Sequence, residues 1–179
     1  MRHELLLADA EEDAESLEAV IQGESPSAYV QRVTALKLDA AVLRLKKRGL
    51  PTAAVLCADT TVALGRKIYG KPEHAEDAER MLAELAGKTH RVLTAIALQQ
   101  GRKRLAALSV SRVTFSTMST REIRAYVASG EPLGKAGAYA VQGHAASHIT
   151  HISGSYSGIM GLPMFETAQL LRALGYKLP

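Results

Sequence analysis

The sequence predicts an α/β protein in which helices flank a mixed, twisted sheet. Segments with helical periodicity alternate with short apolar runs rich in β-branched residues. Two pairs of strand-like segments are joined by connections short enough for hairpins, which excludes a purely parallel sheet. The 179 residues are 47% hydrophobic and 22% charged, ordinary values for a chain with one sizeable core.

The first half of the chain predicts two helices with a strand-rich segment between them. Residues 11–18 are acidic and are typical of a helix or a loop. Ser25 followed by Pro26 is a helix start, and apolar residues at helical spacing continue to Gly49, which ends the helix. The following elements are a buried strand over 52–58, a hairpin over 61–64 and 67–69, and an amphipathic helix over 73–86.

The second half predicts two long strands followed by mainly irregular and helical segments. Ser119 and Glu122 have the spacing of a capping box, and the helix that they begin closes at Gly130. No internal repeat or long linker divides the chain, so a single domain over 1–179 is expected. The other elements are strands over 90–98, 104–115 and 149–152, a Gly- and Ala-rich loop over 132–147, a glycine-rich turn over 154–163, and a helix over 164–174.

Composition excludes several classes of protein. The chain has no run of about 18 apolar residues, and its N-terminus lacks the apolar segment of a signal peptide, so a soluble cytoplasmic protein is expected. Cys57 is the only cysteine and is expected to be a small buried hydrophobe. The net charge of +4 favours anionic ligands, but the basic residues are dispersed and aromatics are only 4%, so no nucleic-acid partner is expected.

An acidic residue, Asp59, follows the apolar run 53–57 and Ala58, and a cation, Lys71, lies between Gly70 and Pro72. Groups just beyond a strand are held rigidly and face open space, where α/β proteins place catalytic side chains. An acid and a base in this order are typical of a site for a phosphate and a metal ion. An Asp-Thr pair after a strand is also typical of a turn or a helix cap, and these few residues alone do not separate the two interpretations.

Other polar residues have weaker signals. Gln142 follows small residues that let the backbone approach a ligand, and its amide could read the edge of a base. The alternative is a tightly packed loop whose small residues only avoid steric crowding. His90, before a strand, is expected to be structural or part of a pocket wall. His144, His148 and His151 are close in sequence, but no cysteine or carboxylate joins them, so surface histidines are favoured over a metal site.

Five blocks of sequence together carry a resemblance. The chain resembles the Maf family of nucleoside triphosphate pyrophosphatases over nearly its whole length, with the blocks in order and at similar spacing. The block 135–143 resembles the subgroup that hydrolyses dTTP and UTP, whereas the 7-methyl-GTP subgroup differs there. The blocks are Ala58-Asp59-Thr60, Gly70-Lys71-Pro72, residues 81–94, residues 135–143, and Gly154-Ser155-Tyr156 with Gly161-Leu162-Pro163.

The resemblance implies a fold like that of the inosine triphosphate pyrophosphatases, with two lobes around a central cleft. It implies hydrolysis of dTTP, UTP and modified pyrimidine triphosphates to monophosphate and pyrophosphate with Mg²⁺ or Mn²⁺, and a homodimer. The carried-over roles are Asp59 as proton acceptor, Lys37 and Lys71 as cleft lysines, Glu18 as a cleft carboxylate that with Asp59 would hold the metal, and Thr60 and Gln142 in substrate choice.

The start of the chain departs from the family pattern. Arg2 matches the second arginine of the family's Ser-x-Ser-Pro-Arg-Arg motif and is expected to bind substrate, whereas Met1 stands where the first arginine belongs. The domain over 1–179 is therefore expected to lack the first strand and the Ser-x-Ser-Pro-Arg residues, which would expose a neighbouring strand edge. Two explanations stay open: a start codon assigned too late, or a degenerate member with altered activity.

The resemblance also leaves the function with alternatives. The family has been tied to inhibition of septum formation, so a non-catalytic regulator of cell division is one of them. A 7-methyl-GTP pyrophosphatase is the other, and Gln142 disfavours it.

Overall fold

Capping residues set the starts of the helices. The computed structural model describes residues 3–9, 12 and 16–178. Ser25 accepts the N–H of Ala28 at the start of α1 (Pro26–Lys47), and Ser119 and Glu122 form a capping box before α3 (Thr120–Ala128). Both predicted starts are confirmed. Helix α2 (Ala75–Leu85) begins two residues later than the predicted 73, because the His74 ring accepts the N–H of Asp77.

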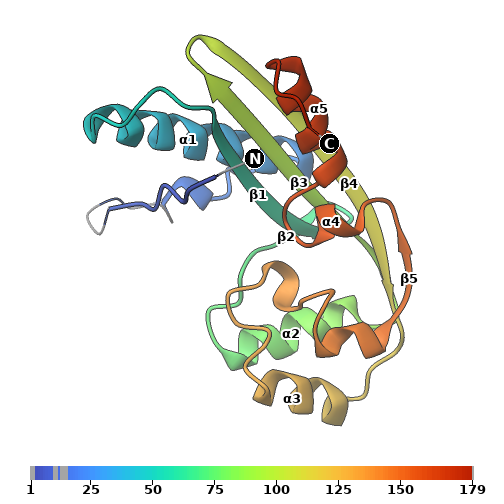
Figure 1. Ribbon diagram of the computed structural model, residues 1–179. Helices are drawn as coiled ribbons and strands as arrows, with labels where there is room; N and C mark the ends of the chain where they lie inside the picture. Colours follow the sequence, from blue (N-terminus) through green and yellow to red (C-terminus); the bar gives the residue numbers. More distant parts are fainter. Residues whose placement is uncertain (1–2, 10–11, 13–15, 179) are drawn as a thin grey trace.

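The strands form one antiparallel sheet in the order β2-β1-β3-β4-β5 (Figure 1). The two-residue turns after β1 and β3 begin with Gly65 and Gly101, whose φ angles of +62° and +57° suit tight hairpins. The predicted α/β class is confirmed. The sheet is antiparallel rather than mixed, because every pairing among the described strands is antiparallel. The strands are β1 (Val55–Leu64), β2 (Lys67–Tyr69), β3 (Thr89–Gln100), β4 (Lys103–Phe115) and β5 (Ile149–Ser153).

The predicted end of a strand at residue 58 is wrong. Strand β1 continues through Asp59, which pairs with Ala95 of β3, to Leu64 at the hairpin. The sequence suggested an end because Asp is disfavoured in strands. The long β3 strand pairs with residues 55–63 of β1, and an ion pair with Lys37 of α1 satisfies the Asp59 carboxylate. Asp59 therefore lies inside a paired strand, with strand residues before and after it, and not in a turn.

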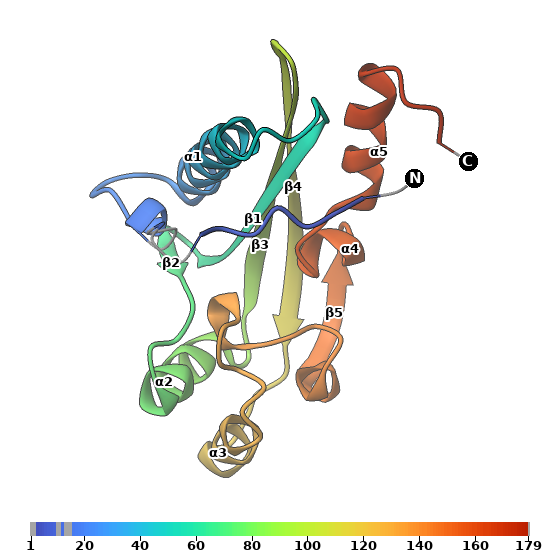
Figure 2. The ribbon, with the colours of Figure 1, turned by 60° about the vertical axis from the view of Figure 1, so that its left-hand side comes forward.

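Helices cover the two faces of the sheet unequally. Helix α1 packs on one face of β1 and β3, where its Val30 and Val33 meet Leu93 and Ala95 in a buried cluster. On the opposite face lie the short helix α4 (Tyr156–Ile159) and helix α5 (Met164–Ala173), which contact β3 and β4 (Figure 2). The apolar side chains of α1 recur at helical spacing, so a single stripe meets the sheet.

A smaller helical lobe lies at the end of the sheet where β3 begins and β4 ends (Figure 1). Helices α2 and α3 pack together there, and their Leu82 and Tyr126 share one core cluster with Val113 and Phe115 of β4. The predicted arrangement of two lobes is confirmed. Short 3₁₀ segments complete the described structure: η1 (Ser16–Glu18), η2 (Ala136–Ala138) and η3 (His144–His148).

Two expectations from composition can be compared with the described residues. Cys57 is half-buried and packs against the cluster formed by Leu38 and Ala41 of α1, in keeping with an apolar role. No helix in the described ranges combines the length and the apolar character needed to cross a membrane.

Candidate active site

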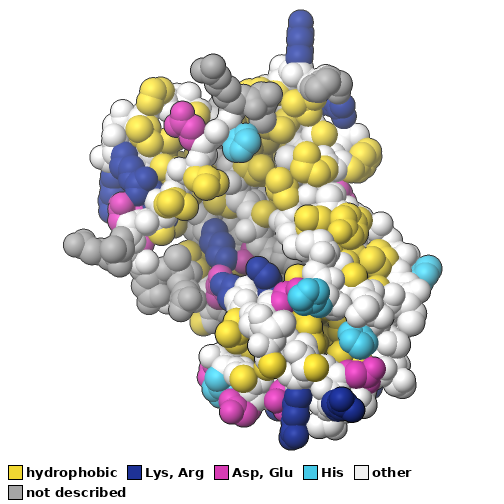
Figure 3. Space-filling view, turned by 60° about the horizontal axis from the view of Figure 1, so that its bottom comes forward, with side chains coloured by type: hydrophobic (Ala, Val, Ile, Leu, Met, Phe, Trp, Pro, Cys, Tyr) yellow, Lys and Arg dark blue, Asp and Glu magenta, His cyan; other side chains and the backbone are white. Residues whose placement is uncertain are grey.

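A cavity of about 340 Å³ lies where the two lobes meet, beside strand β1. Strand β2 pairs only with Val62–Leu64, so residues 55–61 of β1 have no partner on their outer edge among the described strands. Lys, Arg, Asp and Glu side chains gather in a hollow on this face of the molecule (Figure 3). The cavity therefore combines an exposed strand edge with charged side chains.

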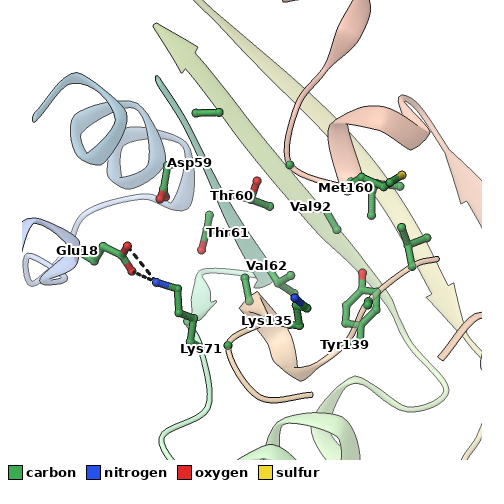
Figure 4. A pocket seen from close by; sticks show the side chains of 18 of the residues that line it. Glu18, Asp59, Thr60, Thr61, Val62, Lys71, Val92, Lys135, Tyr139 and Met160 are labelled. Carbon is green, nitrogen blue, oxygen red and sulfur yellow. Dashed lines mark hydrogen bonds and ion pairs between the residues drawn. The ribbon is translucent and has the colours of Figure 1, made fainter. Parts of the chain in front are cut away.

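The cavity extends around the edge of β1 to both faces of the sheet. Because side chains alternate along a strand, Asp59 points toward α1, whereas Thr60 and Val62 point toward the opposite face. All three line the same cavity. Figure 4 shows Asp59 and Glu18 toward one end and Tyr139 toward the other. One ligand passing the edge could thus meet a charged end and an apolar end.

Four charged side chains form the charged end of the cavity. The Lys37 Nζ of α1 lies 2.5 Å from an Asp59 carboxylate oxygen and 2.7 Å from one of Glu18. The Lys71 Nζ, on the loop after β2, lies 3.2 Å from both oxygens of Glu18. These residues come from separate elements, so the fold brings together all four charged residues that the family resemblance named within the described ranges.

The two carboxyl groups differ in basicity. Burial raises the pKa of Asp59, and the hydrogen bond and charge of Lys37 offset this only in part. Burial also raises the pKa of Glu18, but Lys37 and Lys71 together outweigh it and the net direction is downward. The pKa of Lys37 is lowered by burial and raised more strongly by its two carboxylate partners, so Lys37 is a cation at neutral pH. Asp59 is therefore the better proton acceptor of the pair.

The carboxylate groups of the cavity can be compared with the ligands that divalent cations prefer. Glu18 and Asp59 offer carboxylate oxygens to the same cavity, and hard oxygen ligands suit Mg²⁺ and Mn²⁺. In the described part of the chain, no three His, Cys, Asp or Glu side chains gather as an all-protein metal cage. This pattern fits Mg²⁺, which usually binds through one or two carboxylates together with substrate phosphates and waters.

The two remaining described candidates also reach the cavity. Thr60 lines it from β1, and Gln142 lines it from the loop after η2, where its side chain is exposed. Arg2 lies outside the described residues.

Four residues that sequence reasoning did not select also line the cavity or support its wall. Lys135 and Tyr139 come from the Gly- and Ala-rich block, and Met160 from the glycine-rich turn. Thr94 of β3 is buried behind Thr60 and bonded to it. The position of Lys135 at the head of a block of small residues was a usable signal. Thr94 had none, because a threonine in a buried strand is ordinary.

His90 supports the wall of the cavity, as expected from the sequence. Its side chain is 1% exposed, its Nε2 lies 2.8 Å from the Tyr139 hydroxyl, and its Nδ1 is buried without a partner. The rings of His90, Tyr139 and Phe115 meet edge to face. Burial lowers the pKa of His90 from 6.5 to about 4, so the folded protein holds it neutral.

This depressed pKa predicts a loss of stability in mild acid. The unfolded chain binds a proton at His90 near pH 6.5, whereas the folded chain resists it until about pH 4. The free energy of unfolding is therefore highest above about pH 6.5, where His90 is neutral in both the folded and the unfolded chain. It falls as the pH drops, by about 2 kcal/mol between pH 7 and pH 5. Urea unfolding at both pH values should show a smaller fall for His90→Gln than for the parent. Equal falls would show that His90 does not titrate in this way.

Comparison with known proteins identifies the same family as the sequence blocks. The family description "Maf-like protein" matches residues 1–174. A protein of Albidiferax ferrireducens named "dTTP/UTP pyrophosphatase" is 72% identical over 177 residues, covering 99% of this chain and 88% of the relative. Proteins with that name from Polaromonas sp. and Cupriavidus metallidurans are 64% and 62% identical over 178 and 173 residues, covering 99% and 97% of this chain and 88% and 86% of the relatives. The resemblance is confirmed.

Proposed function

Since the chain belongs to the Maf family, we infer that it is a nucleoside triphosphate pyrophosphatase that hydrolyses dTTP and UTP to the monophosphate and pyrophosphate. The observation that carries this function is the charged end of the cavity, where Lys37 joins Glu18 and Asp59 beside Lys71. Cations suit the triphosphate, and a carboxylate suits the attacking water. The apolar end suits a base. The relatives' name specifies the same reaction class.

We assign the phosphates to the lysines that line the cavity. Lys71 is half-exposed and Lys135 also lines the cavity, so both can approach the triphosphate as point charges. Lys37 lies deeper and is paired with both carboxylates. Its role is to keep Asp59 and Glu18 ionised and to hold Asp59 at a fixed position. Positioned charge of this kind stabilises the negative charge that develops on phosphate oxygens in the transition state.

Asp59 is assigned as the general base. Its carboxylate accepts a proton from water as the water oxygen attacks the α-phosphorus, the α–β anhydride bond breaks, and pyrophosphate leaves with the bonding electrons. The raised pKa of Asp59, caused by burial, favours this proton transfer. When bound through Glu18 and Asp59, Mg²⁺ or Mn²⁺ would neutralise phosphate oxygens.

The apolar end of the cavity is assigned to the base. Val92 of β3 and Met160 after α4 line it together with Tyr139, and Thr60 and Gln142 supply polar groups at its border. A pocket of mostly apolar walls with a few directed polar groups is typical of small-molecule recognition. We propose that Thr60 and Gln142 read the polar edge of the pyrimidine.

The function is tested by assaying pyrophosphate release from a panel of triphosphates with Mg²⁺ or Mn²⁺. We expect dTTP and UTP to exceed CTP, ATP and GTP in kcat/KM by about tenfold or more, and to yield monophosphate and pyrophosphate in equal amounts. Release of orthophosphate, or no turnover of either substrate, would contradict the assignment. Preferential hydrolysis of 7-methyl-GTP would instead support the other subgroup, and a septation effect without turnover would support the regulator.

Three further statements are proposals. Because both lobes contribute side chains to one cavity, we propose that residues 1–179 act as one catalytic domain. A homodimer, measured by light scattering, and a cytoplasmic location, measured by cell fractionation, stay predictions.

A further inference from the structure

Three oxygen atoms form a chain of hydrogen bonds behind the apolar end of the cavity. The Thr94 Oγ1 of β3 lies 2.7 Å from the carbonyl oxygen of Gly158 in α4. The same Oγ1 lies 2.8 Å from the Oγ1 of Thr60 in β1. Thr94 is 1% exposed, so no solvent competes for its hydroxyl. The chain thus connects a buried residue to one that lines the cavity.

The Gly158 carbonyl fixes the direction of every bond in this chain. A carbonyl oxygen can only accept, so Thr94 must donate its one hydroxyl proton to Gly158. The Thr94 oxygen is then left as an acceptor, and the Thr60 hydroxyl must donate to it. With its proton committed, Thr60 can offer only oxygen lone pairs to a ligand. The direction in which the Thr60 hydroxyl donates is therefore set by Thr94, which does not reach the cavity.

The Thr60 oxygen lies at the wall of the cavity. A Cβ built on Gly161 would lie 3.6 Å from Thr60 Oγ1, and both residues line the cavity. The glycine backbone therefore leaves the oxygen accessible from the apolar end. A ligand group that reaches Thr60 must supply a proton, because two acceptors facing each other would leave both without a partner.

We infer that Thr94, through this bond chain, fixes Thr60 as a hydrogen-bond acceptor and so makes the pocket select pyrimidines that carry a ring N–H. Uracil and thymine have such a donor at N3, flanked by two carbonyl oxygens. Cytosine has a lone pair at N3 and would place an acceptor against Thr60. The inference rests on the proposed function, since it assumes that the base lies at the apolar end. Thr94 is a positioning residue, because it acts only through Thr60.

The test is the ratio of kcat/KM for UTP to that for CTP in Thr94→Val, which has the same shape without the hydroxyl. The Thr60 proton would lose its acceptor and could turn toward cytosine N3, so we expect the ratio to fall about tenfold. Thr94→Ser keeps the oxygen and should keep the parent ratio. UTP methylated at N3 should be a poor substrate for the parent.

A control separates this effect from loosening of the loop before α4. The Ser111 hydroxyl of β4 bonds the backbone N–H and carbonyl of Ser155, so Ser111→Ala weakens the same loop without touching Thr60. We expect Ser111→Ala to lower activity on UTP and CTP equally, leaving their ratio unchanged. A fall of the ratio in Ser111→Ala equal to that in Thr94→Val would assign the effect to the loop and overturn the inference.

The remaining outcomes distinguish this inference from the proposed function. If the parent hydrolyses dTTP and UTP but Thr94→Val, checked as folded by circular dichroism, keeps the parent ratio, only the inference fails. An equal loss for UTP and CTP would also overturn it, because Thr60 would then face the ribose. If the parent hydrolyses neither dTTP nor UTP, the proposed function fails and the inference fails with it.

Discussion

Replacement of Asp59 by Asn is expected to lower kcat for dTTP about 100-fold or more while leaving the fold intact. The amide has the same shape but cannot accept the proton of water. It also removes a negative charge from beside Lys37, which lies 2.5 Å away. Glu18 still neutralises that lysine at 2.7 Å, so the ammonium is not left unpaired and the protein should fold. Single-turnover assays with dTTP, together with circular dichroism, measure both parts of the prediction.

The matched control is Asp39→Asn. Asp39 lies in α1, two residues from Lys37, but it is more than half exposed and pairs with Arg104 on the surface. Its replacement makes the same change in net charge without entering the cavity, so we expect parent turnover. Hydrolysis of dTTP by Asp59→Asn at the Asp39→Asn rate would remove Asp59 from the mechanism.

Replacement of Gly137 by Ala is expected to cost about 3 kcal/mol of unfolding free energy. Gly137 has φ +70°, a left-handed conformation that costs other residues roughly 1–2 kcal/mol. Its added Cβ would also lie 2.9 Å from three carbons of Val62, and such overpacking costs about 1–3 kcal/mol. The Gly137 N–H bonds the Gly70 carbonyl, so the contact holds the helical lobe against the sheet. Urea unfolding followed by circular dichroism measures the loss.

Gly134 offers a control for the backbone part of this cost. Its φ of +73° is nearly the same, but a Cβ added there would meet nothing within 4 Å. Gly134→Ala should therefore cost only the roughly 1–2 kcal/mol of the left-handed conformation. The difference between the two variants then reports the contact with Val62. Equal losses would show that the lobes adjust to the extra methyl group.

The helices and hairpins were largely predictable because their signals act over a few residues. Ser25 caps α1 through Ala28, and Ser119 and Glu122 close a capping box, each within one helical turn. The hairpin of β1 and β2 follows from Gly65 in a two-residue turn. The prediction failed at Asp59, where local propensity indicated the end of a strand. Pairing with β3 overrode that preference.

The sequence predicted which residues belong to the candidate site better than it predicted how they are arranged in space. The family blocks named Asp59, Lys71 and Thr60, and these reach one cavity. Arg2 stays a prediction outside the described residues. Lys135 was visible in the sequence without a role, and Thr94 had no signal at all. A buried threonine becomes informative only when its hydrogen-bond partners are known, because its hydroxyl can donate or accept.

The sequence by itself determined where helices begin, which strands form hairpins and which family the residues resemble, because these depend on neighbours in the chain or on the order of motifs. Only the tertiary structure decided that Asp59 and Thr60 point to opposite faces of one strand and share a cavity around its edge. It also decided the raised pKa of Asp59 and, because Thr94 donates to the Gly158 carbonyl, the direction of the Thr60 hydroxyl bond. Both follow from burial and from contacts between residues that are 22 to 64 positions apart in the chain. A sequence pattern that spans a few residues carries no information about such contacts.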